Sequence, residues 1–241
     1  MNRWKASASH FGLSLLVIGG IAITAFLLWY PYALYRVASL DRILLVMLGI
    51  DLTAGPLLTL ILYRPGKRGL KFDLAVVAIA QLAFLAYGLH TLWSSRPVFL
   101  VGTPETFTVV FANEIDDQDL ARAADPKWRK LSWAGPILVA TRMPEAADER
   151  RKIIEEFMAG GAGIERSPKY YMRYEQMASE LAKAAKPAKA IDIDDHDINR
   201  TGKVASDLGW LPVISRRGEA VMLMDKATGR PLRVVAERAE R

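Results

Sequence analysis

The stretch "GIDLTAGPLLTLILYRPGKRGLKFD", residues 49–73, joins two long apolar runs through a short basic loop. A carboxylate, Asp51, lies inside the first of these runs, and Gly55 and Pro56 follow it. A charge in the middle of an apolar segment is costly unless a partner or a function maintains it. The stretch therefore predicts a membrane hairpin with an unusual acid in its first arm.

Three apolar runs indicate three transmembrane helices, at about residues 11–30, 43–63 and 72–93. Each has about the 20 residues that a helix needs to cross a ~30 Å hydrocarbon layer. The first run contains no charge and ends in aromatic residues, which favours a retained anchor over a cleaved signal peptide. Three such runs within 93 residues argue against buried helices of a soluble protein. We expect residues 1–94 to form a three-span bundle.

The basic loop predicts the orientation of these spans. It carries four cations, which are Arg64, Lys67, Arg68 and Lys71. Arg3 and Lys5 precede the first span, whereas the loop between the first two spans holds only Arg36 and Arg42. The positive-inside rule then places the N-terminus and the basic loop in the cytoplasm. Residues 95–241 would lie across the inner membrane, in the periplasm of a Gram-negative bacterium.

The basicity of the chain belongs to its membrane part. Residues 1–93 contain eight Lys or Arg against three Asp, a net charge of +5, whereas the remainder carries about +1. A nucleic-acid-binding protein would concentrate its positive charge on the soluble part, so we expect no nucleic-acid partner. The chain has no cysteine, which excludes disulfides and thiolate metal sites.

Residues 95–241 predict an α+β domain with a terminal β-meander. The runs "PVFLV" and "TFTVVFA" form a hairpin, and "GPILVATRMP" gives a further strand. Two helices follow, over "EAADERRKIIEEFMAG" and over residues 167–186, while Asn113 would cap a short helix before them. Three strands, "GWLPVI", "EAVMLMD" and "RPLRVV", close the chain. The predicted fold class is a membrane protein with three N-terminal transmembrane α-helices followed by an α+β periplasmic domain.

No motif of a known catalytic, cofactor or metal site occurs in the sequence, so we expect neither an enzyme nor a bound cofactor. The three histidines have no metal-ligand spacing, and GxSxG, HExxH and P-loop patterns are absent. One acidic cluster, residues 192–197, alternates like a calcium ligand set but lacks the glycine and glutamate of an EF-hand loop. A polar connector is the simpler interpretation, and an ion there remains the alternative.

Asp51 has two main interpretations, both involving helix packing; proton conduction is a third, and no chain of titratable residues continues from Asp51 to support it. Gln81 lies 15 residues beyond Gly66, as Asp51 lies 15 before it, so the two sit at similar depth in an antiparallel pair. An amide donating to the carboxyl would lower the cost of burying it. Gly55 lies on the same helical face and permits a close approach, while Pro56 frees a backbone carbonyl, that of Leu52. The four residues either cement the bundle, which we favour, or form a docking site for another transmembrane helix.

The chain resembles the TfpX/TfpZ family of type IV pilin accessory proteins over nearly its whole length. The opening "MNRWKASASHFGLSLLV", the segment from "LLVMLGIDLTAGPLLTL" to "RPVFLV", and "GWLPVISRRGEAVMLMDKATGRPL" carry the resemblance. Its most specific parts are Asp51, Gly55 and Pro56, and the "KFDLA" that begins at Lys71. The resemblance implies an inner-membrane protein that assists its cognate major pilin in a chaperone-like way, and it brings no catalytic residue with it.

The resulting hypothesis is an accessory protein of fimbrial assembly or pilus dynamics that binds its cognate major type IV pilin within the lipid bilayer. Other inner-membrane proteins of pilus assembly are possible further partners. An alternative is a membrane-anchored periplasmic sensor that binds a ligand and signals through a partner. Its weakness is that the cytoplasmic segments are too short for an output domain. A membrane enzyme acting on pilin is the third class, although it would be expected to have more spans and clustered acidic or His residues.

Overall fold

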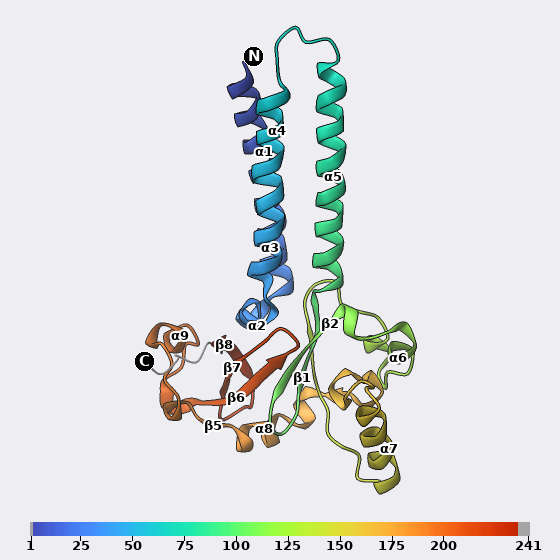
Figure 1. The fold of residues 1–241 in the computed structure, drawn as a ribbon. Helices are drawn as coiled ribbons and strands as arrows, with labels where there is room; N and C mark the ends of the chain where they lie inside the picture. The colour runs from blue at the N-terminus through green and yellow to red at the C-terminus, as the bar shows by residue number, and fades with distance from the viewer. Residues whose placement is uncertain (1, 236–241) are drawn as a thin grey trace. The chain divides into compact units, whose positions relative to one another are not determined.

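Two compact units make up the computed structural model, which describes residues 2–235 apart from the side chains of residues 42 and 43 (Figure 1). One unit comprises Met1–Leu27 and Leu40–Ser94, and the other comprises Leu28–Ser39 and Ser95–Arg241. The sequence placed a single division after residue 94. The structure differs in one segment, because residues 28–39 pack with the sheet and not with the spans. Met1 and residues 236–241, the ends of the two predicted parts, lie outside the described residues.

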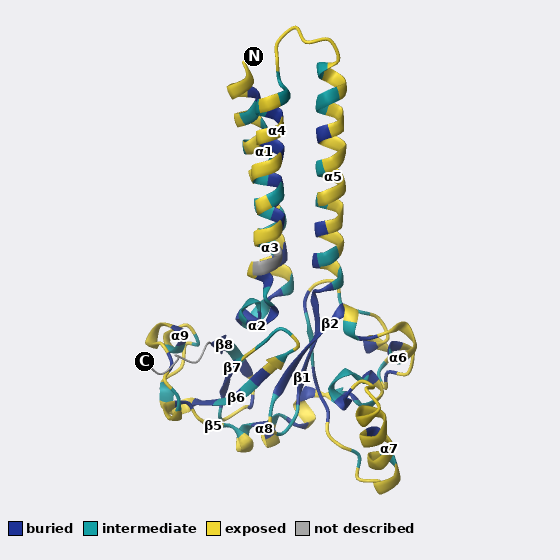
Figure 2. Ribbon diagram, viewed as in Figure 1, coloured by how far each residue is buried: buried dark blue, intermediate teal, exposed yellow. Residues whose placement is uncertain are grey.

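The first unit contains three helical spans, as predicted. They are α1 (Arg3–Trp29), the segment Leu44–Leu62, and α5 (Leu70–Ser94), all long and apolar enough to cross a membrane. Many of their apolar side chains are exposed, as the yellow ribbon of Figure 2 shows, and Leu16 is 76% exposed. Exposed leucine is stable on a helix that contacts lipid, so this pattern agrees with a membrane bundle.

The second span is interrupted by a π-helical turn. It consists of α3 (Leu40–Gly49), the π-turn η2 (Ile50–Ala54) and α4 (Gly55–Leu62). Pro56 has no N–H and cannot donate to a carbonyl in the preceding turn. In π register that carbonyl belongs to the residue five positions earlier, which is Asp51. The sequence predicted that Pro56 would deprive the Leu52 carbonyl of its helical N–H, whereas in π register the carbonyl that faces Pro56 is that of Asp51.

The second unit is built on one mixed sheet with the strand order β4-β3-β1-β2-β6-β7-β8, and β5 pairs with β6. The strands are β1 (Pro97–Gly102), β2 (Phe107–Phe111), β3 (Ile137–Ala140), β4 (Met172–Arg173), β5 (Lys186–Pro187), β6 (Leu208–Ser215), β7 (Gly218–Asp225) and β8 (Pro231–Val235). Strands β1 and β2 are buried along their whole length (Figure 2), in keeping with their aromatic and β-branched residues. The predicted β1–β2 hairpin and the terminal β6–β7–β8 meander are both confirmed, as is the fold class of three long apolar N-terminal helices followed by a unit of mixed helices and strands.

The helices of this unit are shorter than the sequence suggested. They are α6 (Asp117–Ala121), α7 (Ala147–Met158), α8 (Ala178–Ala184) and α9 (Asp195–Asn199). The helix predicted over residues 167–186 is wrong except for α8. Tyr171 and Tyr174 bury their rings in the core instead, and each hydroxyl donates to a backbone carbonyl. The cap of α6 is Asp116 and not Asn113, because the Asp116 carboxylate accepts from the N–H of Asp119.

Residues 28–39, which connect two spans, fold as part of the sheet unit. They form η1 (Pro31–Ala33) and α2 (Tyr35–Ala38), and the side chains of Leu34, Val37 and Ala38 are fully buried. The Ser215 hydroxyl donates to the Val37 carbonyl at 2.6 Å. The connection between the first two spans is therefore a core element of the second unit.

Asp197 links this segment to the sheet through two arginines. Its carboxylate accepts from Arg36 at 2.8 Å and from Arg233 at 2.9 Å, and the residue is only 6% exposed. Asp194, from the same acidic cluster, caps α9 by accepting from the N–H of His196. Within residues 2–235 no group of three or more His, Cys, Asp or Glu is placed to hold a metal ion. Asp197, which could have served as a cation ligand, is instead the partner of two guanidinium groups.

Candidate functional site

Asp51 lies in the π-turn of the second span and is 5% exposed. The sequence places it near the middle of Leu44–Leu62, where hydrocarbon would surround an unprotected side chain. Burial among the three helices removes the carboxyl from direct lipid contact. The bundle alone thus tolerates an acid at this depth.

Two apolar grooves of the bundle share Asp51 as a lining residue. The α3–α5 groove has a volume of about 430 Å³, and its lining consists of Val46, Met47, Ile50, Asp51, Phe84, Tyr87, Gly88 and Thr91. The α1–α5 groove has a volume of about 230 Å³, and its lining consists of His10, Leu13, Ser14, Val17, Ile18, Asp51, Ala78, Gln81, Leu82 and Leu85. The carboxyl is thus the acidic group common to two otherwise largely apolar grooves.

Gln81 contacts Asp51, but not in the predicted way. Its Nε2 lies 3.5 Å from the backbone carbonyl oxygen of Asp51, not from the carboxylate. The π-turn explains this arrangement, because Pro56 leaves that carbonyl without the N–H that π register would supply. The amide of Gln81 thus donates to the backbone carbonyl of Asp51. The Asp51 carboxyl is not used in this contact and can accept a hydrogen bond from another group.

Small residues bring the second and third spans together at two levels. Gly55 and Pro56 are buried, and a Cβ built on Gly55 would lie 1.8 Å from Nε2 of Gln81. At the other level a Cβ on Gly88 would lie 2.8 Å from Cε of Met47. Glycine at both positions leaves room for a longer side chain of the facing helix. The pair of Gly88 and Met47 was not predicted.

The first span joins this site through polar contacts that the sequence analysis missed. Nδ1 of His10 lies 2.6 Å from Oγ1 of Thr59, and the Ser7 hydroxyl donates to the Pro56 carbonyl at 2.9 Å. His10 also lines the α1–α5 groove together with Asp51. The signal was present in the sequence as Ser7 and His10, which are three residues apart and so share one helical face. Both residues lie near the end of the first span, where polar residues are common, so the sequence did not single them out.

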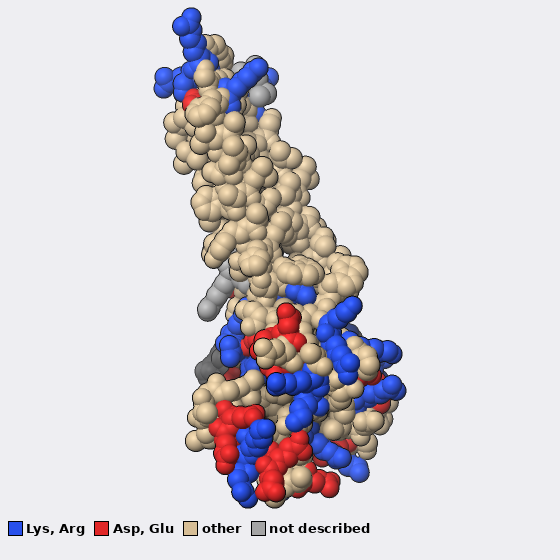
Figure 3. Space-filling model, turned by 90° about the vertical axis from the view of Figure 1, so that its right-hand side faces the viewer, with Lys and Arg blue, Asp and Glu red and all other residues tan. Residues whose placement is uncertain are grey.

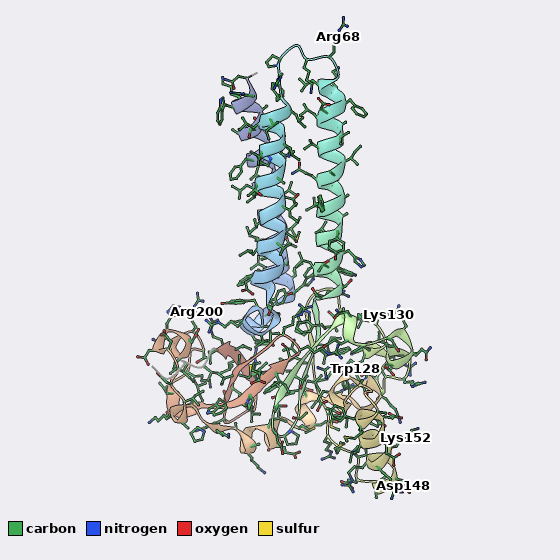
Figure 4. The ribbon with its side chains drawn as sticks, in the orientation of Figure 1. Arg68, Trp128, Lys130, Asp148, Lys152 and Arg200 are labelled. Carbon is green, nitrogen blue, oxygen red and sulfur yellow. The ribbon has the colours of Figure 1, made fainter. Side chains whose placement is uncertain are left out.

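The four cations of the basic loop are all exposed at one end of the span unit. Figure 3 shows this basic end beyond a long surface without charge, and Figure 4 labels Arg68 at the tip of the loop. Lys67 forms an ion pair with Asp73 at 2.5 Å. The charge is therefore segregated along the spans, as a membrane protein requires.

The two grooves offer mainly apolar surface with a single carboxyl. The carboxyl of Asp51, the imidazole of His10 and the phenol of Tyr87 are the ionisable side chains that line the two grooves. A partner helix that enters either groove would bury apolar surface and could donate a hydrogen bond to the Asp51 carboxyl. Such bonds between transmembrane helices contribute about 1–2 kcal/mol in model systems.

We predict that Gly55→Leu destabilises the bundle, because the new side chain occupies the position of the Gln81 amide. The expected loss is about 2 kcal/mol, typical of overpacking, and it should appear as a lower unfolding temperature in detergent. Gly20→Leu is the matched control, since Gly20 is exposed on α1 and nothing lies within 4 Å of a Cβ built there. Equal unfolding temperatures for the two variants would refute the close contact.

Three curated proteins are similar in sequence to this chain. The chain is 30% identical to the fimbrial assembly protein of serogroup I from Dichelobacter nodosus over 235 residues, which cover 92% of this chain and 90% of that relative. It is 29% identical to the serogroup E1 protein of the same organism over the same shares. A third relative, the protein of serogroups C1 and C2, is 33% identical over 49% of this chain. No family model matches the chain. No solved structure matches it significantly.

Proposed function

Since the chain belongs to the family of fimbrial assembly proteins, we propose that it is a TfpX/TfpZ-type accessory protein that assists assembly of a type IV pilus by binding its cognate major pilin. The similarity over 92% of the chain carries this proposal, because it includes the spans and the sheet unit together. A role based only on a membrane anchor would not require both parts.

The bundle is the proposed receptor for the pilin's transmembrane helix. The α3–α5 groove is largely apolar, and two of its lining residues, Tyr87 and Phe84, are 72% and 53% exposed. An apolar helix from a partner would cover these rings, and a polar group of that helix would reach Asp51. Pilins await assembly with an apolar N-terminal helix in the inner membrane, so a membrane-embedded groove suits them.

The proposed orientation puts the N-terminus and the basic loop in the cytoplasm and the sheet unit in the periplasm. Six cations support it, since Arg3, Lys5, Arg64, Lys67, Arg68 and Lys71 all belong to the side that would be cytoplasmic. A pilin with its head in the periplasm would then meet the sheet unit as well. The proposed action is non-enzymatic, because binding at two levels of the pilin can guide it without chemistry.

The proposal predicts that the cognate pilin is recovered with this protein from membranes. A photo-crosslinking amino acid at Tyr87, inside the α3–α5 groove, should yield an adduct with pilin in mild detergent extracts. The same probe at Leu16, which is 76% exposed on α1 and lines neither groove, is the matched control. Adducts of equal yield at both positions, or none at Tyr87, would contradict helix binding in the groove.

A further inference from the structure

The loop "KWRKLSWAG", residues 127–135, is attached to residues that end the membrane spans. The indole N–H of Trp29, the last residue of α1, donates to the Trp133 carbonyl at 2.7 Å. The guanidinium Nε of Arg96, two residues beyond the end of α5, donates to the neighbouring Ser132 carbonyl at 3.0 Å. Two consecutive carbonyls of this loop are thus bonded to side chains at the exits of two different spans.

Gly135 makes this attachment close. Its φ is +106°, a conformation that favours glycine, and a Cβ there would lie 2.7 Å from the carbonyl oxygen of Leu28. The loop backbone therefore contacts the chain just before Trp29. Since the last residues of a span lie at the boundary between hydrocarbon and water, residues 132–135 lie at that boundary too.

Two side chains of the loop pack into the hydrophobic core, and this packing fixes the positions of the side chains that face outward. Trp128 is 7% exposed and packs edge-on against Tyr171, and Leu131 packs against the same core cluster. Trp133, in contrast, is 66% exposed, and Lys127 and Lys130 are exposed. Figure 4 labels Trp128 and Lys130 in this loop. One tryptophan thus anchors the loop in the core, and the other points away from it.

We propose that residues 127–134 form a peripheral membrane contact, in which the Trp133 indole enters the headgroup layer and Lys127 and Lys130 bind the phosphates of anionic phospholipids. Tryptophan is enriched at this depth because its ring is apolar and its N–H can remain hydrated. Lysine near an anionic membrane surface is attracted to it by the negative surface potential. The contact needs no pilin, so it stands apart from the proposed function.

Tryptophan is enriched both at protein interfaces and in the belts of membrane proteins at the lipid–water boundary. The position of Trp133 favours a membrane over a protein partner, because its carbonyl accepts a hydrogen bond from Trp29, the residue where the first span ends. The headgroup layer already surrounds that position, and a protein partner would first have to displace it. Lipid is therefore the occupant that the geometry favours.

The absence of cysteine from the chain makes a single-site test direct. Trp133→Cys carries one thiol, which is labelled with bimane in the full chain reconstituted in nanodiscs of phosphatidylcholine and phosphatidylglycerol. Lipids brominated near the headgroup should quench this label. Met158→Cys, on α7 and 79% exposed, is the control and should keep its emission. Ala134→Cys retains the tryptophan and should be quenched like Trp133→Cys.

Two outcomes would overturn the proposal. Unchanged emission at residues 133 and 134 in brominated nanodiscs would show that the loop lies in water. Quenching at 133 that is equal with brominated phosphatidylcholine and brominated phosphatidylglycerol would refute the anionic headgroup contact. With the proposal, phosphatidylglycerol quenches more strongly, and Lys127→Gln with Lys130→Gln removes that preference.

Discussion

Replacement of Asp51 by leucine is expected to abolish most of the capture of pilin while leaving the three-span bundle folded. The carboxyl is 5% exposed in an apolar surrounding, so its removal relieves the cost of burying an acid. Gln81 bonds to the backbone of residue 51, and that bond survives the substitution. We therefore expect the bundle to pack without this side chain, which is the acidic group of both grooves.

The expected loss of binding follows from one interhelical hydrogen bond. Such a bond contributes about 1–2 kcal/mol within a membrane, and 1.4 kcal/mol corresponds to tenfold in affinity. The measurement is the amount of pilin that co-purifies from detergent extracts, with the unfolding temperature of the variant recorded alongside it. We expect about a tenfold loss of pilin and an unchanged or higher unfolding temperature.

Asp41→Leu is the matched control, because Asp41 is an exposed acid at the start of the same span. It should retain normal capture. If Asp51→Leu captured pilin normally, the carboxyl would have no part in recognition and the docking interpretation would fall. If Asp51→Leu unfolded the bundle, the carboxyl would be a structural element and not a spare acceptor.

The membrane part of the fold was predictable because each of its signals is local. A span is recognised by the length of an apolar run, and the basic loop by its composition. The site was only partly predictable for the opposite reason. Proximity of Gln81 to Asp51 followed from counting along two antiparallel helices, but the atom that accepts the bond depends on a change from α to π register. Sequence periodicity does not report that change.

Residues 28–39 show a pattern that sequence reasoning could have used. Tyr30, Ala33, Leu34, Val37 and Ala38 are all buried, and their spacing repeats as an apolar helical stripe. Their position between two spans suggested a simple connection, so the stripe was overlooked. The helix predicted over residues 167–186 failed for a related reason, because burial of two tyrosines outweighs local helix propensity.

Replacement of Asp197 by alanine is expected to destabilise the sheet unit by about 3 kcal/mol, which lowers its unfolding temperature by roughly 8 °C. The carboxylate is the shared partner of Arg36 and Arg233, whose side chains are 26% and 17% exposed. Its loss leaves two guanidinium groups close together without a counter-charge. The measurement is thermal unfolding of the full chain in detergent, followed by the circular dichroism of the sheet. Asp195→Ala, an exposed acid on the same helix, is the control and should change little.

The same carboxylate gives the prediction a pH dependence. Burial raises the pKa of Asp197, but hydrogen bonds from Arg233 and Arg36 outweigh that effect and hold the pKa below its ordinary value. A depressed pKa in the folded state stabilises the fold above the ordinary carboxyl pKa of about 3.9 and loses that contribution as pH falls further. The wild-type chain should therefore exceed Asp197→Ala in stability at neutral pH, and the difference should shrink below about pH 4. A difference that stays constant through this range would mean that packing, and not the charge, holds residues 28–39 on the sheet.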